Sequence, residues 1–216
     1  VRGRFQLKQM PQAGMTVAEV AGTMLARSDL LPPGVEPCPE ATSVWTAPNR
    51  TMPDEEGRCR SYLTAANAAH IALIEIDRAT GRVDVQKYFI VDDCGTRLNP
   101  AMVEGQIQGG VAQGIGAALY EQYVYDERAQ PLVTTWADYL MPTVHEVPKT
   151  HKAAVVTPSP FTPFGAKGCG EGAMHTTPAA ILCAINDALA PLGLEIHETP
   201  ASPHRLWQLL QQAKRD

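Results

Sequence analysis

The sequence predicts an α+β fold, in which hairpins and helices mix without a regular βαβ alternation. Residues 68–77 and 82–91 are rich in apolar and β-branched side chains and are separated by a short turn, which predicts a β-hairpin. Asn99 and Ser202 each directly precede a proline. An N-cap residue followed by a first-turn proline is typical of a helix start.

Composition and charge exclude several classes of protein. The 216 residues carry 18 Lys and Arg against 23 Asp and Glu, with no basic run, so we expect no nucleic-acid partner. No apolar stretch approaches the roughly 18 residues that a membrane span needs. The five cysteines are widely spaced and contain no CxxC pair, which favours buried thiols in a reducing cytoplasm over a zinc site or a disulfide framework.

The chain is expected to divide into a helix plus long loop over 1–67 and a folded core over 68–216. Thr16 and Glu19 are spaced as a capping box, which predicts a short helix after Thr16. Residues 28–67 are rich in proline and polar side chains. They form either an ordered loop that lies on a partner surface or a flexible linker.

The helix that begins after Asn99 is expected to run to about Tyr120 and to be unusually rich in glycine. Its apolar residues recur every four positions, at Val103, Ile107, Val111 and Ile115. Its glycines are Gly105, Gly109, Gly110, Gly114 and Gly116. A glycine inside a helix costs roughly 1 kcal/mol relative to alanine. We therefore infer that a neighbouring backbone or a ligand packs very close to this helix.

The remaining elements are predicted from the same signals. Thr177 precedes a proline and so repeats the pattern seen at Asn99 and Ser202. The expected elements are a second hairpin over 122–125 and 132–135, a strand over 152–157, a helix from Thr177 to about Ala190, and a last helix from Ser202 to about Lys214.

Two glycine-rich stretches, 110–116 and 165–171, could be mistaken for nucleotide-binding loops. Their spacings are GxxxGxG and GxxGxG, so neither matches the GxGxxG of a dinucleotide fold or the GxxxxGK[ST] of a P-loop. The second stretch places backbone amides just before a helix, where they can donate to a phosphate or a polar heterocycle. Lys167 adds a cation there. Glu171 ends the stretch, either as a functional carboxylate or as a solvated one stabilised by the helix dipole.

Short motifs follow one another along the chain in an order that is itself informative. They include Asp93-Cys94-Gly95, Leu98-Asn99-Pro100, Ala112-Gln113-Gly114, Asp138-Tyr139, Met141-Pro142-Thr143 and the stretch 165–171. Together they resemble the large subunit of the molybdenum hydroxylases, the family of xanthine dehydrogenase, aldehyde oxidase and carbon monoxide dehydrogenase. The resemblance covers nearly the whole chain, most clearly from Ala69 onward. It implies that 1–216 is the C-terminal part of a molybdopterin-binding subunit.

The resemblance also implies roles for individual residues. Glu171 matches the glutamate that acts as general base beside the molybdenum. Gln113 matches the glutamine whose amide hydrogen-bonds the pterin. The residues expected to bind the cofactor are Gln113, Gly114, Lys167, Gly168, Cys169 and Gly170. Cys169 stands where the family commonly has valine, a conservative change that leaves the role of Glu171 intact.

The other titratable residues have ordinary structural interpretations. Asp92 and Asp93 follow a predicted strand, where carboxylates usually cap or pair with cations. His145 and His151 lack the spacing of helical metal ligands, so we expect no metal ligand from the protein. His175 lies four residues beyond the second glycine stretch and could face a substrate pocket.

The resemblance implies a molybdenum–molybdopterin cofactor, in the cytosine dinucleotide form if the source is bacterial. Iron–sulfur and FAD centres are expected only on partner domains or subunits, within an oligomer that includes the remainder of the large subunit and acts on a small-molecule substrate. Carbon monoxide, purines, aldehydes and aromatic heterocycles all stay open as substrates. We expect the isolated chain to be inactive. The alternative is a non-catalytic assembly or scaffold module, which would not need the intact glycine stretch and Glu171.

Overall fold

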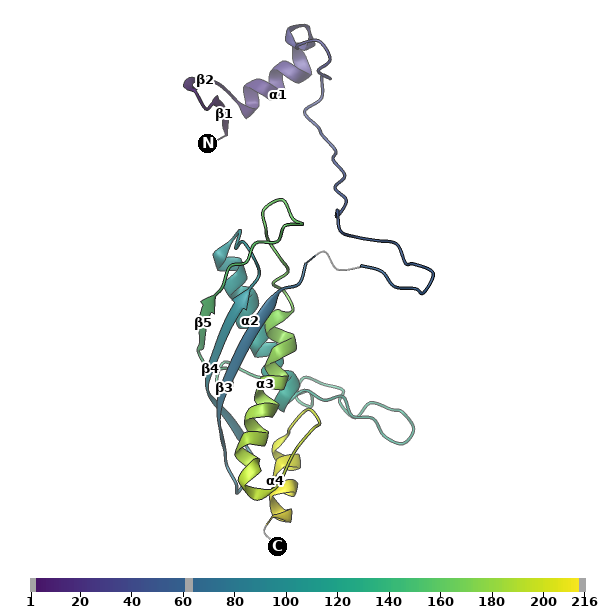
Figure 1. Cartoon of the computed structure of the whole chain (residues 1–216), viewed down its shortest axis with the longest axis vertical. Helices are drawn as coiled ribbons and strands as arrows, with labels where there is room; N and C mark the ends of the chain where they lie inside the picture. The colour runs from purple at the N-terminus through teal and green to yellow at the C-terminus, as the bar shows by residue number, and fades with distance from the viewer. Residues whose placement is uncertain (1–2, 61–63, 214–216) are drawn as a thin grey trace. The chain divides into compact units, whose positions relative to one another are not determined.

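The computed structural model describes residues 3–60 and 64–213, which form two units, Val1–Thr46 and Ala47–Asp216. The first unit contains an antiparallel hairpin of β1 (Arg4–Leu7) and β2 (Met10–Thr16), followed by helix α1 (Val17–Ala26) and a short 3-10 turn (Figure 1).

The capping box that starts α1 is confirmed. The Glu19 amide donates to Thr16 Oγ1 at 3.1 Å, and the Thr16 amide donates to the Glu19 carboxylate at 2.7 Å. The sequence did not predict the hairpin, since β2 contains a proline and a glycine, which strands disfavour. Gly14 is required there because a Cβ would lie 2.1 Å from the Phe5 carbonyl oxygen. No residue of α1 is buried within this unit.

The second unit is built on a three-stranded sheet in the order β3-β4-β5. The predicted hairpin is confirmed: β3 (Asn67–Ile76) pairs antiparallel with β4 (Val83–Asp93). Strand β5 (Thr150–Ala154) pairs parallel with β4, so the chain crosses over between them through helix α2 (Pro100–Leu119). The strand expected over 152–157 starts two residues earlier and ends three residues earlier than predicted.

Two long helices cover one face of this sheet (Figure 1). Helix α3 (Gly172–Leu189) packs on β3 and β4, and α2 packs against α3. Helix α4 (Pro203–Gln212) follows a short 3-10 turn and buries Leu206 and Leu210. The four-residue periodicity predicted for α2 is confirmed, because Val103, Ile107, Val111 and Ile115 are all buried. Each fully buried isoleucine or leucine contributes roughly 1.5–3 kcal/mol.

The predicted start of the third helix is wrong. Helix α3 begins at Gly172, five residues before Thr177, and Pro178 lies inside it. The Thr177 hydroxyl donates to the Ala173 carbonyl one turn earlier at 2.7 Å, so it bonds within the helix and does not cap it. By contrast, Asn99 and Ser202 cap α2 and α4 as predicted, accepting from the amides of Met102 and Arg205.

The predicted second hairpin forms only around its turn. Residues 121–149 contain no strand, and part of this segment projects from the helices and the sheet (Figure 1). The Asp126 turn forms, with its carboxylate accepting from the Gln130 amide at 2.9 Å, and the Leu132 amide donates to the Val124 carbonyl at 2.8 Å beside a bridge between Tyr125 and Pro131. Pairing does not extend into two strands, and a two-stranded hairpin without a packing surface is marginal.

Candidate functional site

The stretch 165–171, here called the glycine loop, leads from the end of β5 into the first turn of α3. Gly165 has a φ of +72°, and a Cβ there would lie 2.7 Å from the Pro158 side chain. The Lys167 amide donates to the Cys94 carbonyl at 2.8 Å, so the first half of the loop is fastened beside the end of β4. The second half, from Gly168 onward, leads to Glu171.

Glu171 occupies the N-cap position of α3, yet its side chain makes no capping hydrogen bond. Its backbone is helical, with φ −104° and ψ −15°, which differs from the extended conformation of the N-cap residues Asn99 and Ser202. The residue is exposed. Its carboxylate therefore makes no hydrogen bond to the first turn of its own helix, an arrangement compatible with both the functional and the solvated interpretation of Glu171.

Two glycines of α2 allow close packing against α3. A Cβ on Gly110 would lie 2.8 Å from the Ala173 Cβ, and one on Gly114 would lie 2.4 Å from the Thr177 Cβ. The first turns of α3, directly after Glu171, therefore lie against the middle of α2. Gly114 directs its side-chain position at α3, whereas its neighbour Gln113 is exposed.

Besides Gly22 of helix α1, five other described glycines, which lie on α2, in the glycine loop and at the start of α3, have no such explanation. A Cβ added to any of them would have no neighbour within 4 Å, and none has a positive φ. These open glycines are Gly105 and Gly109 on α2, and Gly168, Gly170 and Gly172 at the start of α3. Gly105, Gly109 and Gln113 recur at intervals of four and so share one exposed face of α2. The lack of an internal reason fits a bulky group that approaches these backbones from outside the chain.

Lys167 differs from the free cation that its position suggested. Its ammonium group lies 3.1 Å from Asp93 Oδ2 and 2.7 Å from Thr157 Oγ1, and only 10% of the side chain is exposed. Hydrogen bonds from Thr157 and from the Gly95 amide, and then from Lys167, hold the pKa of Asp93 well below its usual value. The side chain of Lys167 therefore forms an internal ion pair, and its backbone amide is bonded to the Cys94 carbonyl.

A buried hydrogen-bond chain, which the sequence did not predict, joins the sheet to α3. His70 Nδ1 lies 2.7 Å from the Tyr88 hydroxyl, which donates to Thr177 Oγ1 at 3.0 Å. Burial lowers the pKa of His70 to about 4 and raises that of Tyr88 to about 12. Since Tyr88 donates to Thr177, His70 must donate from Nδ1, which leaves Nε2 as a bare acceptor.

A cavity of about 20 Å³ lies between the glycine loop and the end of β4. Asp92, Cys94 and Cys169 line it, and Asp92 Oδ1 is buried without a hydrogen-bond partner among the described residues. Burial, and then the neighbouring Asp92, raise the pKa of the Cys94 thiol. Cys169 packs against the core, as expected of a residue that replaces valine.

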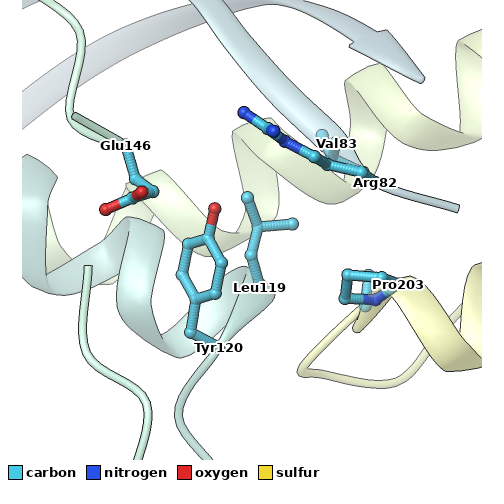
Figure 2. A pocket seen from close by; sticks show the side chains of 7 residues that line it. Arg82, Val83, Leu119, Tyr120, Glu146 and Pro203 are labelled. Atoms are coloured by element: carbon cyan, nitrogen blue, oxygen red, sulfur yellow. The ribbon is translucent and has the colours of Figure 1, made fainter. Parts of the chain in front are cut away.

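A separate cavity of about 270 Å³ lies at the C-terminal end of α2, away from the glycine loop. Figure 2 shows the Tyr120 hydroxyl directed into the space bordered by Glu146 and Arg82. Its apolar lining comes from Val83, Leu119, Ala201 and Pro203. None of the residues expected to bind a cofactor lines it.

Residues 3–60 and 64–213 show neither a metal cluster nor a membrane-spanning helix. No cluster of three or more His, Cys, Asp or Glu side chains in this part of the chain is arranged to hold a metal ion. Among the same residues, no helix combines the length and the apolar character that crossing a membrane requires.

Comparison with known proteins decides the family. The model of the molybdopterin cofactor-binding domain matches residues 1–148. The chain belongs to this family. It is 38% identical to the nicotine 6-hydroxylase large subunit of Paenarthrobacter nicotinovorans over 195 residues, which is 90% of this chain and 22% of the relative. It is 33% identical to the carbon monoxide dehydrogenase large chain of Hydrogenophaga pseudoflava over 209 residues, or 97% of this chain and 24% of the relative.

Solved structures of the family confirm the α+β fold. Quinoline 2-oxidoreductase from Pseudomonas putida 86 superposes with a TM-score of 0.78 at 40% identity, over 97% of this chain and 25% of the other. The Cu,Mo-containing carbon monoxide dehydrogenase superposes with a TM-score of 0.75 at 31% identity, over 98% of this chain and 25% of the other. The molybdopterin-binding chain described here thus spans about a quarter of the length of its relatives.

Proposed function

We propose that this chain forms one wall of the cofactor site in a molybdenum-dependent oxidoreductase that hydroxylates a carbon centre or oxidises carbon monoxide. Glu171 is the general base. One observation carries the proposal: the exposed Glu171 carboxylate, which makes no capping hydrogen bond, follows Gly168 and Gly170, two loop glycines that have no internal reason to be glycine. The printed names of the relatives, a nicotine hydroxylase and a carbon monoxide dehydrogenase, support this reaction class.

The described residues fit a molybdopterin. Gln113 and the open glycines Gly105 and Gly109 leave one face of α2 free for a bulky heterocycle, with the Gln113 amide able to donate and accept hydrogen bonds. The backbones of Gly168, Cys169 and Gly170 are proposed to line the same group, along with those of Lys167 and Gly114.

The cofactor and the residues of this chain have different roles in the proposed reaction. When bound, the cofactor supplies a metal that accepts two electrons. Glu171 accepts the proton that the reaction releases, and Gln113 orients the pterin. In a site closed to water a carboxylate holds a proton more strongly, which suits a group that must accept one.

We further propose the cytosine dinucleotide form of the cofactor, because the named relatives come from bacteria. Mass spectrometry of the nucleotide released by acid from the intact protein tests this point. Cytidine monophosphate is the expected product, and the absence of any nucleotide would contradict it.

The proposed partners are the remainder of a large subunit, an iron–sulfur subunit and a flavin subunit. Two relatives are named as a large subunit and as the gamma subunit of a complex. The outer face of the sheet also exposes apolar side chains that a partner could cover, with Ile71, Leu73 and Val91 exposed by 63%, 49% and 39%. All five cysteines are free thiols, which supports a reducing cytoplasm. The expectation that they are buried is wrong for Cys38, Cys59 and Cys183, which are exposed.

The test uses Glu171→Gln and Gln113→Ala in the intact, assembled protein. Glu171→Gln keeps the size of the side chain but removes the base, so kcat should fall by at least roughly 10²–10⁴-fold at normal molybdenum content. Gln113→Ala removes a hydrogen bond to the pterin and should lower molybdenum content. Two matched controls are expected to change neither: Glu127→Gln in an exposed turn, and Gln108→Ala, about 140° around α2 from Gln113.

The scaffold interpretation makes the opposite prediction for these variants. If the chain only supports assembly, neither Glu171→Gln nor Gln113→Ala changes turnover or molybdenum content. Full activity of Glu171→Gln at full molybdenum occupancy would therefore remove this chain from the catalytic wall.

A further inference from the structure

We propose that Asp93 is a positioning residue for the glycine loop. Through a buried ion pair with Lys167 and hydrogen bonds with Thr157, it fixes the loop that carries Glu171 to the end of β4. The inference rests on the proposed function of Glu171. Asp93 acts through the loop and not on a ligand, because its carboxylate contacts other residues of this chain.

The ion pair is almost completely removed from water. Lys167 Nζ lies 3.1 Å from Asp93 Oδ2, and the two side chains are 10% and 9% exposed. Asp93 also accepts hydrogen bonds from the Gly95 amide at 2.9 Å, from the Thr157 amide at 3.2 Å and from the Thr157 hydroxyl. The Asp93 carboxylate therefore accepts from several donors. The Lys167 ammonium group, by contrast, is bonded to one anion among the described residues, which is Asp93.

Backbone contacts tie the same two segments together. The Thr96 and Ser159 amides both donate to the Gly165 carbonyl, at 3.1 and 2.9 Å, and the Lys167 amide donates to the Cys94 carbonyl at 2.8 Å. The approach is so close that a Cβ on Gly95 would lie 2.2 Å from the Gly165 oxygen. We call this assembly of 93–96 with 157–167 the clamp. Glu171 follows its last residue by four positions, so the clamp sets where the loop enters α3.

The two partners of the ion pair should not be equivalent. Asp93→Asn leaves a buried ammonium group without an anion, which is strongly unfavourable. Lys167→Met leaves a carboxylate that still accepts from Gly95 and Thr157. The double variant Asp93→Asn/Lys167→Met removes both charges and should lie closer to wild type than Asp93→Asn alone.

A matched control lies on the same strand. Asp84 pairs with Arg82 at 2.6 Å, but the two side chains are 43% and 66% exposed. Exposed pairs contribute little. Asp84→Asn makes the same chemical change as Asp93→Asn without stranding a buried charge, so we expect it to leave the clamp unchanged.

Amide hydrogen exchange in the intact, assembled protein reads the clamp directly. The amides of Thr96, Ser159 and Lys167 report on it, and the amide of Ile115 in the core of α2 reports on global opening. In Asp93→Asn the clamp amides should exchange at least tenfold faster while Ile115 is unchanged. The acceleration should be smaller in Lys167→Met, partly reversed in the double variant and absent in Asp84→Asn.

Turnover supplies the functional reading. At equal molybdenum content, kcat should fall at least tenfold in Asp93→Asn and recover in part in the double variant, a rescue that general loss of stability does not produce. Clamp amides that exchange no faster in Asp93→Asn, or only in step with Ile115, overturn the proposal, as does a double variant as impaired as Asp93→Asn. Failure of the proposed function is distinguishable, because it appears as full turnover in Glu171→Gln whatever the exchange rates at the clamp.

Discussion

Gly109→Ala tests whether a ligand shapes the open face of α2. A methyl group at Gly109 meets no atom within 4 Å, and its φ needs no glycine. Alanine is favoured over glycine inside a helix by roughly 1 kcal/mol, so the free energy of unfolding of this chain should rise by about that amount. If a cofactor lies against this face, the same methyl group should lower the molybdenum content of the intact protein. One substitution then stabilises the fold and impairs the site.

Gly114→Ala is the matched variant on the same helix. Its methyl carbon would lie 2.4 Å from the Thr177 Cβ, so the helices must separate, at a cost of roughly 1–3 kcal/mol that exceeds or cancels the gain in helix propensity. Chemical denaturation of the chain and metal analysis of the intact protein measure the two effects. The argument from open glycines is wrong if Gly109→Ala keeps full molybdenum content, or if it destabilises the chain as Gly114→Ala does.

Three further outcomes follow from the described contacts. The chain purified alone should contain no molybdenum, because Glu171, Gln113 and the open glycines supply only one side of a pocket; near-stoichiometric metal by elemental analysis would refute this. Tyr88→Phe removes the hydroxyl between His70 and Thr177 and should lower the free energy of unfolding by roughly 1–3 kcal/mol, measured in urea. Burial lowers the pKa of His70 to about 4, from 6.5, so the unfolded chain binds the extra proton between these values. Stability should therefore fall as pH drops through that window and stay level above it, and His70→Gln should abolish this component in Tm measurements at pH 7 and 5.

Helix starts could be predicted where the signal is local. Asn99 and Ser202 each accept a hydrogen bond from the amide three residues later, so a segment of three or four residues is enough to predict the helix start. The start of α3 could not, because its N-cap Glu171 does not cap and Pro178 mimics a first-turn proline. The predicted hairpin around Asp126 forms only at its turn for a different reason: no third strand or helix covers it.

The candidate site residues were proposed from the order of the motifs. Gln113, the glycine loop and Glu171 come from the resemblance, and they lie on α2 and at the start of α3, two helices that pack together. The clamp was missed because Asp93 and Lys167 are 74 residues apart, and a pairing of that range leaves no local pattern. The glycines of α2 were expected to face one close neighbour, but they serve two purposes. Gly110 and Gly114 admit α3, and Gly105 and Gly109 remain open.

The unusual start of α3 connects these observations. Helices α1, α2 and α4 each satisfy a first-turn amide with the side chain of Thr16, Asn99 or Ser202, whereas α3 has no side-chain cap. Unsatisfied amides at a helix N-terminus favour an anion or a polar acceptor. Gly168, Gly170 and Gly172 place no side chains over these amides, and the clamp fixes the first half of the loop to the end of β4. A carboxylate held at the same place without capping its helix keeps both oxygens available to other groups, as the proposed role of Glu171 requires.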